Sequence, residues 1–207
     1  MVEVPVYDMQ GAKVGTLDVD EAKFGGQVNV ALLKQAVVAY HTNSHQGSAA
    51  TRSRGQVEGS TRKLYKQKGT GNARRGPLRT NLMRGGGVAF GKVPHRHRHS
   101  LSRQERRGAL NSAILAKLLG SDLMVVEGLK LDRPRTKPMA NLLAKLQVPG
   151  SCVLTLAERD DVIYRSTRNL PRVDVRTVAE LNAFDVAKRR TMLLTREAMD
   201  VLLGGPQ

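Results

Sequence analysis

Residues 102–127 read SRQERRGALNSAILAKLLGSDLMVVE, and the order of polar and apolar positions in this stretch decides the fold. Ser102 and Glu105 have the spacing of a capping box, in which each side chain accepts a hydrogen bond from the other residue's backbone N–H. Apolar side chains then recur on one helical face, at Leu110, Ala113, Ile114 and Leu118. Gly120 follows as a stop signal, and the run at 123–127 is short and apolar, as a buried strand requires. The stretch predicts a helix followed directly by a strand.

The same alternation of strand and helix continues to the end of the chain. Three further apolar runs have the length of short buried strands, at 152–156, 173–175 and 192–194. Apolar residues at helical spacing predict helices at 136–147, 159–168, 178–183 and 196–203. Alternating strands and helices pair their strands in parallel through right-handed crossovers. We therefore expect an α/β fold, an open and mostly parallel sheet with helices on its faces.

Two elements are predicted near the N-terminus. Residues 2–7 and 14–19 alternate apolar and polar side chains around Gly11, which is typical of a hairpin. From Asn29, a suitable N-cap, apolar residues recur at helical spacing as far as Tyr40. This helix should end a few residues later and is the first of the two main helices.

A basic loop of residues 46–99 is inserted between these two helices. It holds 13 of the 34 Lys and Arg residues against one acidic residue, Glu58, and so carries +12 of the formal net charge of +16. Ten of the 20 glycines lie in it, and no helical or strand periodicity is sustained. So little apolar content cannot offset an ordering entropy of roughly 1 to 2 kcal/mol per residue. We predict a globular part of residues 1–45 and 100–207, and a loop of residues 46–99 that is disordered or extended when alone and becomes ordered when it binds a partner.

The glycine motifs of the loop do not fit a nucleotide-binding enzyme. Gly69 and Gly71 begin a GxG, but Arg74 stands where a third glycine is needed and no strand precedes them. Gly71 and Gly76 have the spacing of a P-loop, yet Pro-Leu follows in place of Lys-Ser or Lys-Thr. No GxSxG or HExxH motif occurs. We expect no enzyme activity and no cofactor, and an enzyme stays a distant alternative only because open α/β sheets often bind ligands at their strand ends.

Three other features have structural explanations. The histidines of HRHRH at 95–99 alternate with arginines that oppose a metal dication, so we expect polyanion contact there and no metal site. Asp160 and Asp161 lie at the start of a predicted helix, where negative charge is favoured by the helix dipole, and are not expected to form a catalytic pair. Cys152, the single cysteine, lies in the apolar run CVLTL and should be an inert buried thiol.

The charge of the loop predicts an RNA partner. Binding of Lys and Arg side chains to phosphates is favourable because it releases the counterions that surround the nucleic acid. The loop lacks the apolar face of a membrane-surface segment and the rigid helix or ribbon usual for DNA, and no apolar run approaches the roughly 20 residues of a membrane span. Glycines allow close approach to folded RNA, and Tyr65 can stack on an unpaired base. The candidate RNA-binding residues are Arg52, Arg54, Arg62, Lys63, Lys66, Lys68, Arg74, Arg75, Arg79, Arg84, Lys92, Arg96 and Arg98 of the loop, with Arg103, Arg106 and Arg107 of the next helix, for which a solvated helix face is the alternative.

Four motifs in and beside the loop resemble the bacterial members of the large-subunit ribosomal protein four family. They are QAVVAY at 35–40, TRSRGQVEGSTRK at 51–63, QKGTGNAR at 67–74 and GGGVAFG at 85–91. They stand in the family's order, and the α/β pattern of the remaining chain agrees with it. The resemblance implies a structural protein of the large ribosomal subunit, located in ribosomes of the cytoplasm, that binds ribosomal RNA and supports early subunit assembly.

The resemblance also implies a role for the loop. In the family the globular part lies on the outer side of the subunit, and the loop threads inward through RNA to the wall of the nascent-peptide exit tunnel. Implied partners are ribosomal RNA, neighbouring ribosomal proteins including one with a tunnel-lining hairpin, the nascent peptide, and macrolide antibiotics near the tip. The implied tip, around residues 60–69, contains Arg62, Lys63, Tyr65, Lys66, Gln67 and Lys68.

The sequence departs from the family pattern at two places. Leu64 and Tyr65 stand where Pro-Trp is common, and Asn72 stands where Arg is common. Tyr65 keeps a ring that can stack but offers less area than Trp. A free RNA-binding regulator or assembly chaperone, including a repressor of its own operon, remains the alternative function.

Overall fold

The computed structural model describes residues 1–148 and 150–204. Its regular elements are, in chain order, β1 (Val2–Tyr7), β2 (Lys13–Val19), the 3-10 helix η1 (Glu21–Phe24), α1 (Val30–Asn43), α2 (Arg103–Leu119), β3 (Leu123–Val126), α3 (Thr136–Lys145), β4 (Cys152–Leu156), α4 (Asp161–Thr167), β5 (Val173–Thr177), the 3-10 helix η2 (Val178–Glu180), α5 (Ala183–Lys188), β6 (Thr191–Thr195) and α6 (Arg196–Gly204). The chain forms two compact units. The body consists of Met1–His41 and the chain from His99 onward, and the arm consists of Thr42–Arg98.

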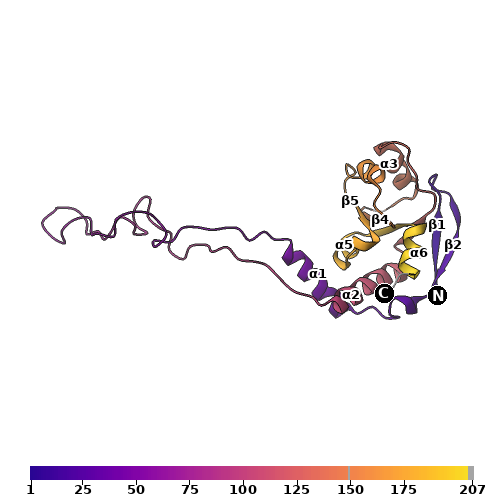
Figure 1. The fold of residues 1–207 in the computed structure, drawn as a ribbon, viewed down its shortest axis with the longest axis horizontal. Helices are drawn as coiled ribbons and strands as arrows, with labels where there is room; N and C mark the ends of the chain where they lie inside the picture. The colour runs from indigo at the N-terminus through magenta and orange to yellow at the C-terminus, as the bar shows by residue number, and fades with distance from the viewer. Residues whose placement is uncertain (149, 205–207) are drawn as a thin grey trace. The chain divides into compact units, whose positions relative to one another are not determined.

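The body is built on one six-stranded sheet with the strand order β2-β1-β3-β6-β4-β5. β1 and β2 form the predicted hairpin, antiparallel, with Val2 opposite Val19. All other neighbouring strands are parallel. Helices connect the parallel strands (Figure 1), as such pairing requires. The expected open and mostly parallel α/β sheet is confirmed.

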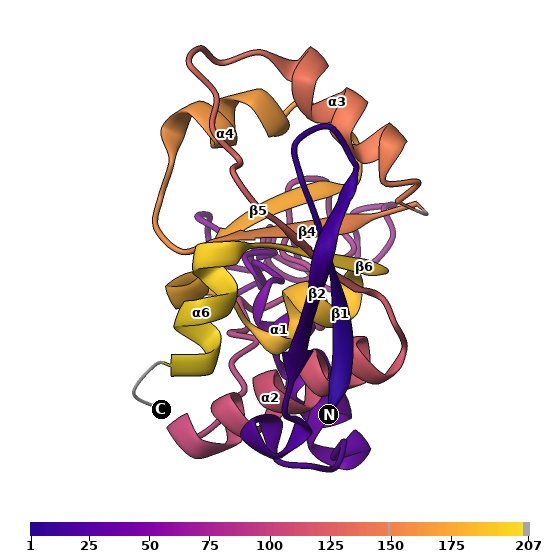
Figure 2. The same ribbon diagram turned by 90° about the vertical axis from the view of Figure 1, so that its right-hand side faces the viewer.

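Helices cover both faces of this sheet. On one face α1, α2, α5 and α6 pack over a core that includes Val125, Met192 and Leu194. On the other face α3 and α4 pack over Leu154 and Leu193. Figure 2 shows α3 and α4 on one side of the strands and α1, α2 and α6 on the other. Because β4 and β6 lie between two helical layers, all five residues of each are buried, and their sequences therefore lack the alternation of a half-exposed strand.

The two helices that the arm connects are capped as their sequences predict. Ser102 Oγ accepts a hydrogen bond from Glu105 N at 3.2 Å, and the Glu105 carboxylate accepts one from Ser102 N at 2.7 Å. These bonds from Ser102 hold the pKa of Glu105 below its ordinary value. At the start of α1, Asn29 Oδ1 accepts from Leu32 N at 3.0 Å. Both ends of the arm are thus attached to helices with well-defined starts.

One predicted helix is wrong. Instead of a helix over 178–183, the chain forms the 3-10 turn η2 and then starts α5 at Ala183. The cause is the side chain of Asn182, whose Oδ1 accepts from Asp185 N at 2.8 Å and so acts as an N-cap. The short η1 was also not predicted, although Asp20 caps it by accepting from Ala22 N.

Three other predictions concern the body. Asp160 Oδ1 accepts from the backbone N of Val162 and of Ile163, which confirms that this acid starts α4. Cys152 is buried, and burial raises the pKa of its thiol to about 11. None of the helices in the described ranges is long and apolar enough to cross a membrane.

Candidate RNA-binding surface

The arm consists of two chain limbs tied together by backbone hydrogen bonds. All of its residues are described, and between the end of α1 and the start of α2 none lies in a helix or strand. The ties run from His95 N to Gly47 O (3.0 Å), from Thr51 N to Lys92 O (2.9 Å), from Val88 N to Arg52 O (2.9 Å) and from Leu64 N to Gly76 O (3.2 Å). These four backbone hydrogen bonds connect the outgoing and returning limbs at four positions along the arm.

Glycines allow the limbs to approach this closely. Gly47 has φ +60°, and a Cβ at this residue would lie 2.0 Å from His95 O. A Cβ at Gly87 would lie 2.1 Å from Arg54 N. Both distances are far shorter than van der Waals contact, so no larger residue fits without separating the limbs. Part of the glycine content of the arm is explained in this way.

The chain reverses direction between Leu64 and Gly76. Lys63 and Pro77 form an antiparallel bridge at the base of this turn. Inside the turn, the Tyr65 hydroxyl donates a hydrogen bond to Ala73 O. Of the six residues that the family resemblance assigns to the tip, four lie in the turn, namely Tyr65, Lys66, Gln67 and Lys68, and two end the outgoing limb, namely Arg62 and Lys63.

Among the residues that the structure describes, no Lys or Arg of the arm forms an ion pair with a carboxylate. Eleven of the 13 are exposed, and Arg75 and Arg79 are partly buried. Within residues 1–148 and 150–204 every ion pair lies in the body, for example Arg176 with Asp185 at 2.9 Å. The arm cations repel one another, and binding of an external polyanion would relieve that repulsion.

The histidines of the arm lie together. The rings of His95 and His97 meet edge to face with centroids 4.9 Å apart, and the His45 ring lies 5.7 Å from that of His97. No group of three His, Cys, Asp or Glu side chains in the described ranges is arranged to hold a metal ion.

In the body, Arg103, Arg106 and Arg107 are exposed at the start of α2. They line a shallow hollow together with Leu110 of the same helix and residues of two other segments, Tyr40 and residues 179–182. No ion pair involves the three arginines in the part of the chain that the structure describes. Tyr40 and Asn182 were not predicted as neighbours of the arginines, because only the packing of α1 and η2 beside α2 brings them there.

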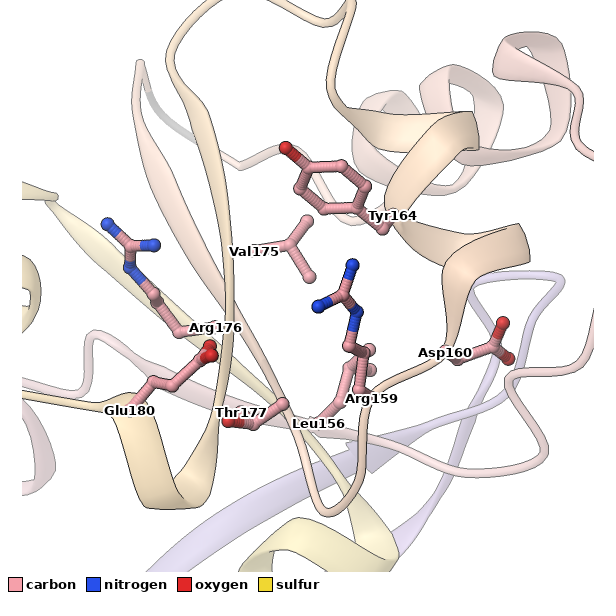
Figure 3. A pocket seen from close by; sticks show the side chains of 8 residues that line it. All are labelled: Leu156, Arg159, Asp160, Tyr164, Val175, Arg176, Thr177 and Glu180. Atoms are coloured by element: carbon pink, nitrogen blue, oxygen red, sulfur yellow. The ribbon is translucent and has the colours of Figure 1, made fainter.

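A second hollow lies at the carboxyl ends of β4 and β5, where open α/β sheets often bind ligands. Its lining consists of Leu156, Arg159, Asp160, Tyr164, Val175, Arg176, Thr177 and Glu180 (Figure 3). Most of its charged groups are engaged within the fold. Asp160 caps α4, Arg159 pairs with Asp161 at 3.1 Å, and Arg176 pairs with Asp185. The sequence did not predict this hollow, and its residues form no evident pair of general acid and base.

Comparison with known proteins gives one consistent result. Residues 17–204 match the model of the ribosomal protein L4/L1 family. The chain is 41% identical over 199 residues to the large ribosomal subunit protein uL4 of Symbiobacterium thermophilum, covering 96% of both chains. It is 39% identical to the protein of the same name from Carboxydothermus hydrogenoformans, covering 96% of this chain and 97% of the relative. A third relative of that name, from Pelotomaculum thermopropionicum, is 40% identical with 96% of both chains covered.

Proposed function

The chain belongs to the ribosomal protein L4/L1 family, and on that premise we propose that it is a non-catalytic structural constituent of the large ribosomal subunit in the cytoplasm. Its direct partner in this role is ribosomal RNA, with neighbouring ribosomal proteins around it. The main support for the proposal comes from the arm. Its two glycine-rich limbs are joined by hydrogen bonds, and its Lys and Arg side chains have no acidic partners among the described residues.

The proposed mechanism is electrostatic and geometric. Each Arg or Lys of the arm that meets a phosphate releases counterions, so RNA binding removes the repulsion between the arm cations. The backbone hydrogen bonds between the limbs already restrict the conformations of the arm, so the arm loses less conformational entropy when it binds between RNA segments. Arg103, Arg106 and Arg107 extend the contact onto the body, beside the ring of Tyr40. Binding of this kind supports early assembly, because it holds RNA segments together before the subunit is complete.

We assign the tip of the arm, around residues 60–69 and including Arg62 and Lys63, to the wall of the exit tunnel. Lys66, Gln67 and Lys68 are exposed there, and the hydrogen bond from Tyr65 to Ala73 orients the Tyr65 ring. The nascent peptide, the hairpin of a neighbouring ribosomal protein and macrolide antibiotics are the partners proposed at this position. Replacement of the family's Pro-Trp by Leu64 and Tyr65 gives this tunnel wall a smaller aromatic surface.

Sedimentation separates this role from that of a free RNA-binding regulator or assembly chaperone. A tagged chain is expressed in cells, and ribosomal subunits are separated on sucrose gradients before and after a high-salt wash. A structural constituent stays with the large subunit after the wash, because its arm is enclosed by RNA. Release at moderate salt into the free pool would favour the regulator and contradict the proposal.

A further inference from the structure

A cluster of arginines lies at the amino-terminal edge of the sheet, the edge opposite to the hollow in Figure 3. Ser151 directly precedes β4, Arg172 precedes β5 and Arg190 precedes β6. In the sheet register Cys152 pairs with both Val173 and Thr191. The residues just before them, Ser151, Arg172 and Arg190, therefore lie side by side at the same height on adjacent strands. Together with Gly150 and Arg189 they line an open hollow, and no acidic residue lines it among the described residues.

The backbone around this hollow is fixed by hydrogen bonds. Ser151 O accepts from Thr191 N at 3.0 Å, and Ser151 Oγ accepts from Arg190 N at 3.2 Å. Arg172 O accepts from Cys152 N at 3.1 Å. The backbones of Arg172 and Arg190 are therefore fixed by hydrogen bonds at the edge of the sheet.

Arg189 is held in place by its side chain. Its Nε donates to Asp174 Oδ2 at 2.6 Å, and the side chain is only 15% exposed. A guanidinium has five N–H donors in a rigid fork, so this bond leaves four donors on a group that is already oriented. Such a fork matches the oxygens of a phosphate group.

Arg172 stands in a backbone conformation that disfavours it. Its φ is +62°, in the left-handed region where glycine has no steric penalty and an L-residue has one. A glycine here would keep the bond from Cys152 N without strain. The chain instead places a second guanidinium beside the hollow.

The surroundings add more positive charge. Lys117 Nζ donates to Arg190 O at 2.6 Å, on the α2 side of the same edge. Partial burial is the main cause that lowers the pKa of Lys117, and Arg190 lowers it further, whereas Asp122 opposes the shift. Arg172, Arg189, Arg190 and Lys117 thus lie near this edge. Asp174 pairs with Arg189 and Asp122 acts on Lys117, but neither Arg172 nor Arg190 forms an ion pair within the described ranges.

We propose that this arginine edge, Ser151 with Arg172, Arg189 and Arg190, binds the phosphate backbone of ribosomal RNA. It is a contact of the body separate from the arm and from the arginines of α2. The inference rests on the proposed function, which supplies RNA as the polyanion. An open hollow lined by forked cations fits a phosphodiester backbone that passes across it, whereas an enclosed pocket would fit a small anion.

The test compares variants of the full chain in binding to purified large-subunit ribosomal RNA over a series of salt concentrations. Arg172→Gly and Arg190→Gln are made singly and together. Arg165→Gln, an exposed arginine of α4 outside the hollow, is the control for loss of one charge. Each lost phosphate contact lowers the slope of log K against log salt by about 0.7 to 0.9. The double variant should lose about 1.5 units of slope and roughly tenfold in affinity near 0.15 M salt, and Arg165→Gln should change little.

Stability measurements separate binding from folding. Arg172→Gly relieves the left-handed strain, so its urea midpoint should not fall. If this variant nevertheless folds poorly, Arg190→Gln alone tests the inference, and it should lower the slope of log K against log salt by about 0.7 to 0.9. A double variant that binds RNA as Arg165→Gln does would overturn the inference and leave the proposed function intact, and an acidic protein partner would then be the better explanation of the edge. Failure of the unaltered chain to bind this RNA would overturn both.

Discussion

Deletion of residues 61–72 should weaken RNA binding without destabilising the body. The deletion removes most of the turn at the end of the arm and four of its cations, Arg62, Lys63, Lys66 and Lys68. None of the described residues in either hydrophobic core comes from the arm. The free energy of unfolding and the affinity for RNA should therefore respond independently.

The expected magnitudes follow from the length and the charge of the deleted segment. The insertion between the two parts of the body shortens from 57 residues, Thr42–Arg98, to 45. Closing this shorter loop costs about 0.2 kcal/mol less, so the body should be unchanged or very slightly more stable. Four cations that each neutralise one phosphate contribute about 3 units to the slope of log K against log salt, and the deletion should remove that amount.

Urea titration of the isolated protein and RNA binding at four or more salt concentrations measure the two quantities. The matched control keeps the chain length and changes the same four cations to Gln, which should reduce the slope equally. A loss of more than about 1 kcal/mol on deletion would refute the independence of body and arm. An unchanged slope would refute the assignment of these cations to phosphates.

Other predictions concern the body. Ser102→Ala should lower the free energy of unfolding by about 1 kcal/mol in urea titration, because it removes the capping box of α2. The lowered pKa of Glu105 means that its contribution is present at neutral pH and lost as the pH falls through the acid range, and Glu105→Gln should remove that part of the pH profile. The pKa of Cys152 is raised from 9.0 to about 11, so stability should fall as the pH rises through this interval, and Cys152→Ala should abolish that fall. Leu193→Ala, in the buried β6, should cost about 2 to 5 kcal/mol, and the exposed Leu119→Ala should change stability by less than about 0.5 kcal/mol.

Four results would contradict these predictions. An acid pH profile of stability that Glu105→Gln leaves unchanged would show that the Glu105 carboxylate does not stabilise the fold. A Ser102→Ala variant as stable as the unaltered chain would mean that the capping box does not hold α2 in solution. An alkaline profile unaffected by Cys152→Ala would show that the thiol is not desolvated. Equal effects of the two leucine substitutions would contradict the position of β6 between two helical layers.

The sheet was predictable because its central strands are buried on both faces. The runs CVLTL and LMVVE do not alternate apolar and polar residues. They were predicted to be buried strands because they are short and because helical stretches separate them. The helix prediction failed at 178–183, where apolar spacing at Val178 and Leu181 suggested a helix but the capping side chain of Asn182 starts one later. Turn chemistry at a single residue overrode the periodicity there.

The candidate site was predictable only in its composition. An excess of cations in one segment can be counted, so the arm and its basic residues follow from the sequence. The ties between the limbs could not be predicted, because they join backbone atoms of residues far apart, as from His95 to Gly47. The same holds for the arginine edge. Ser151, Arg172 and Arg190 become level only when the strand order β6-β4-β5 is known.

Cleavage of RNA from a probe on the arm tests the central claim most directly. Lys66→Cys places an exposed thiol in the turn, and an iron chelate attached to it generates hydroxyl radicals that cut nearby RNA. The buried Cys152, with its raised pKa, should remain unlabelled. In ribosomes that contain this chain, we predict cleavage of large-subunit ribosomal RNA around the exit tunnel, and none at those positions from a probe at Arg165→Cys on α4. Assembled subunits that contain the labelled chain but show no tunnel cleavage from Lys66→Cys would contradict the account.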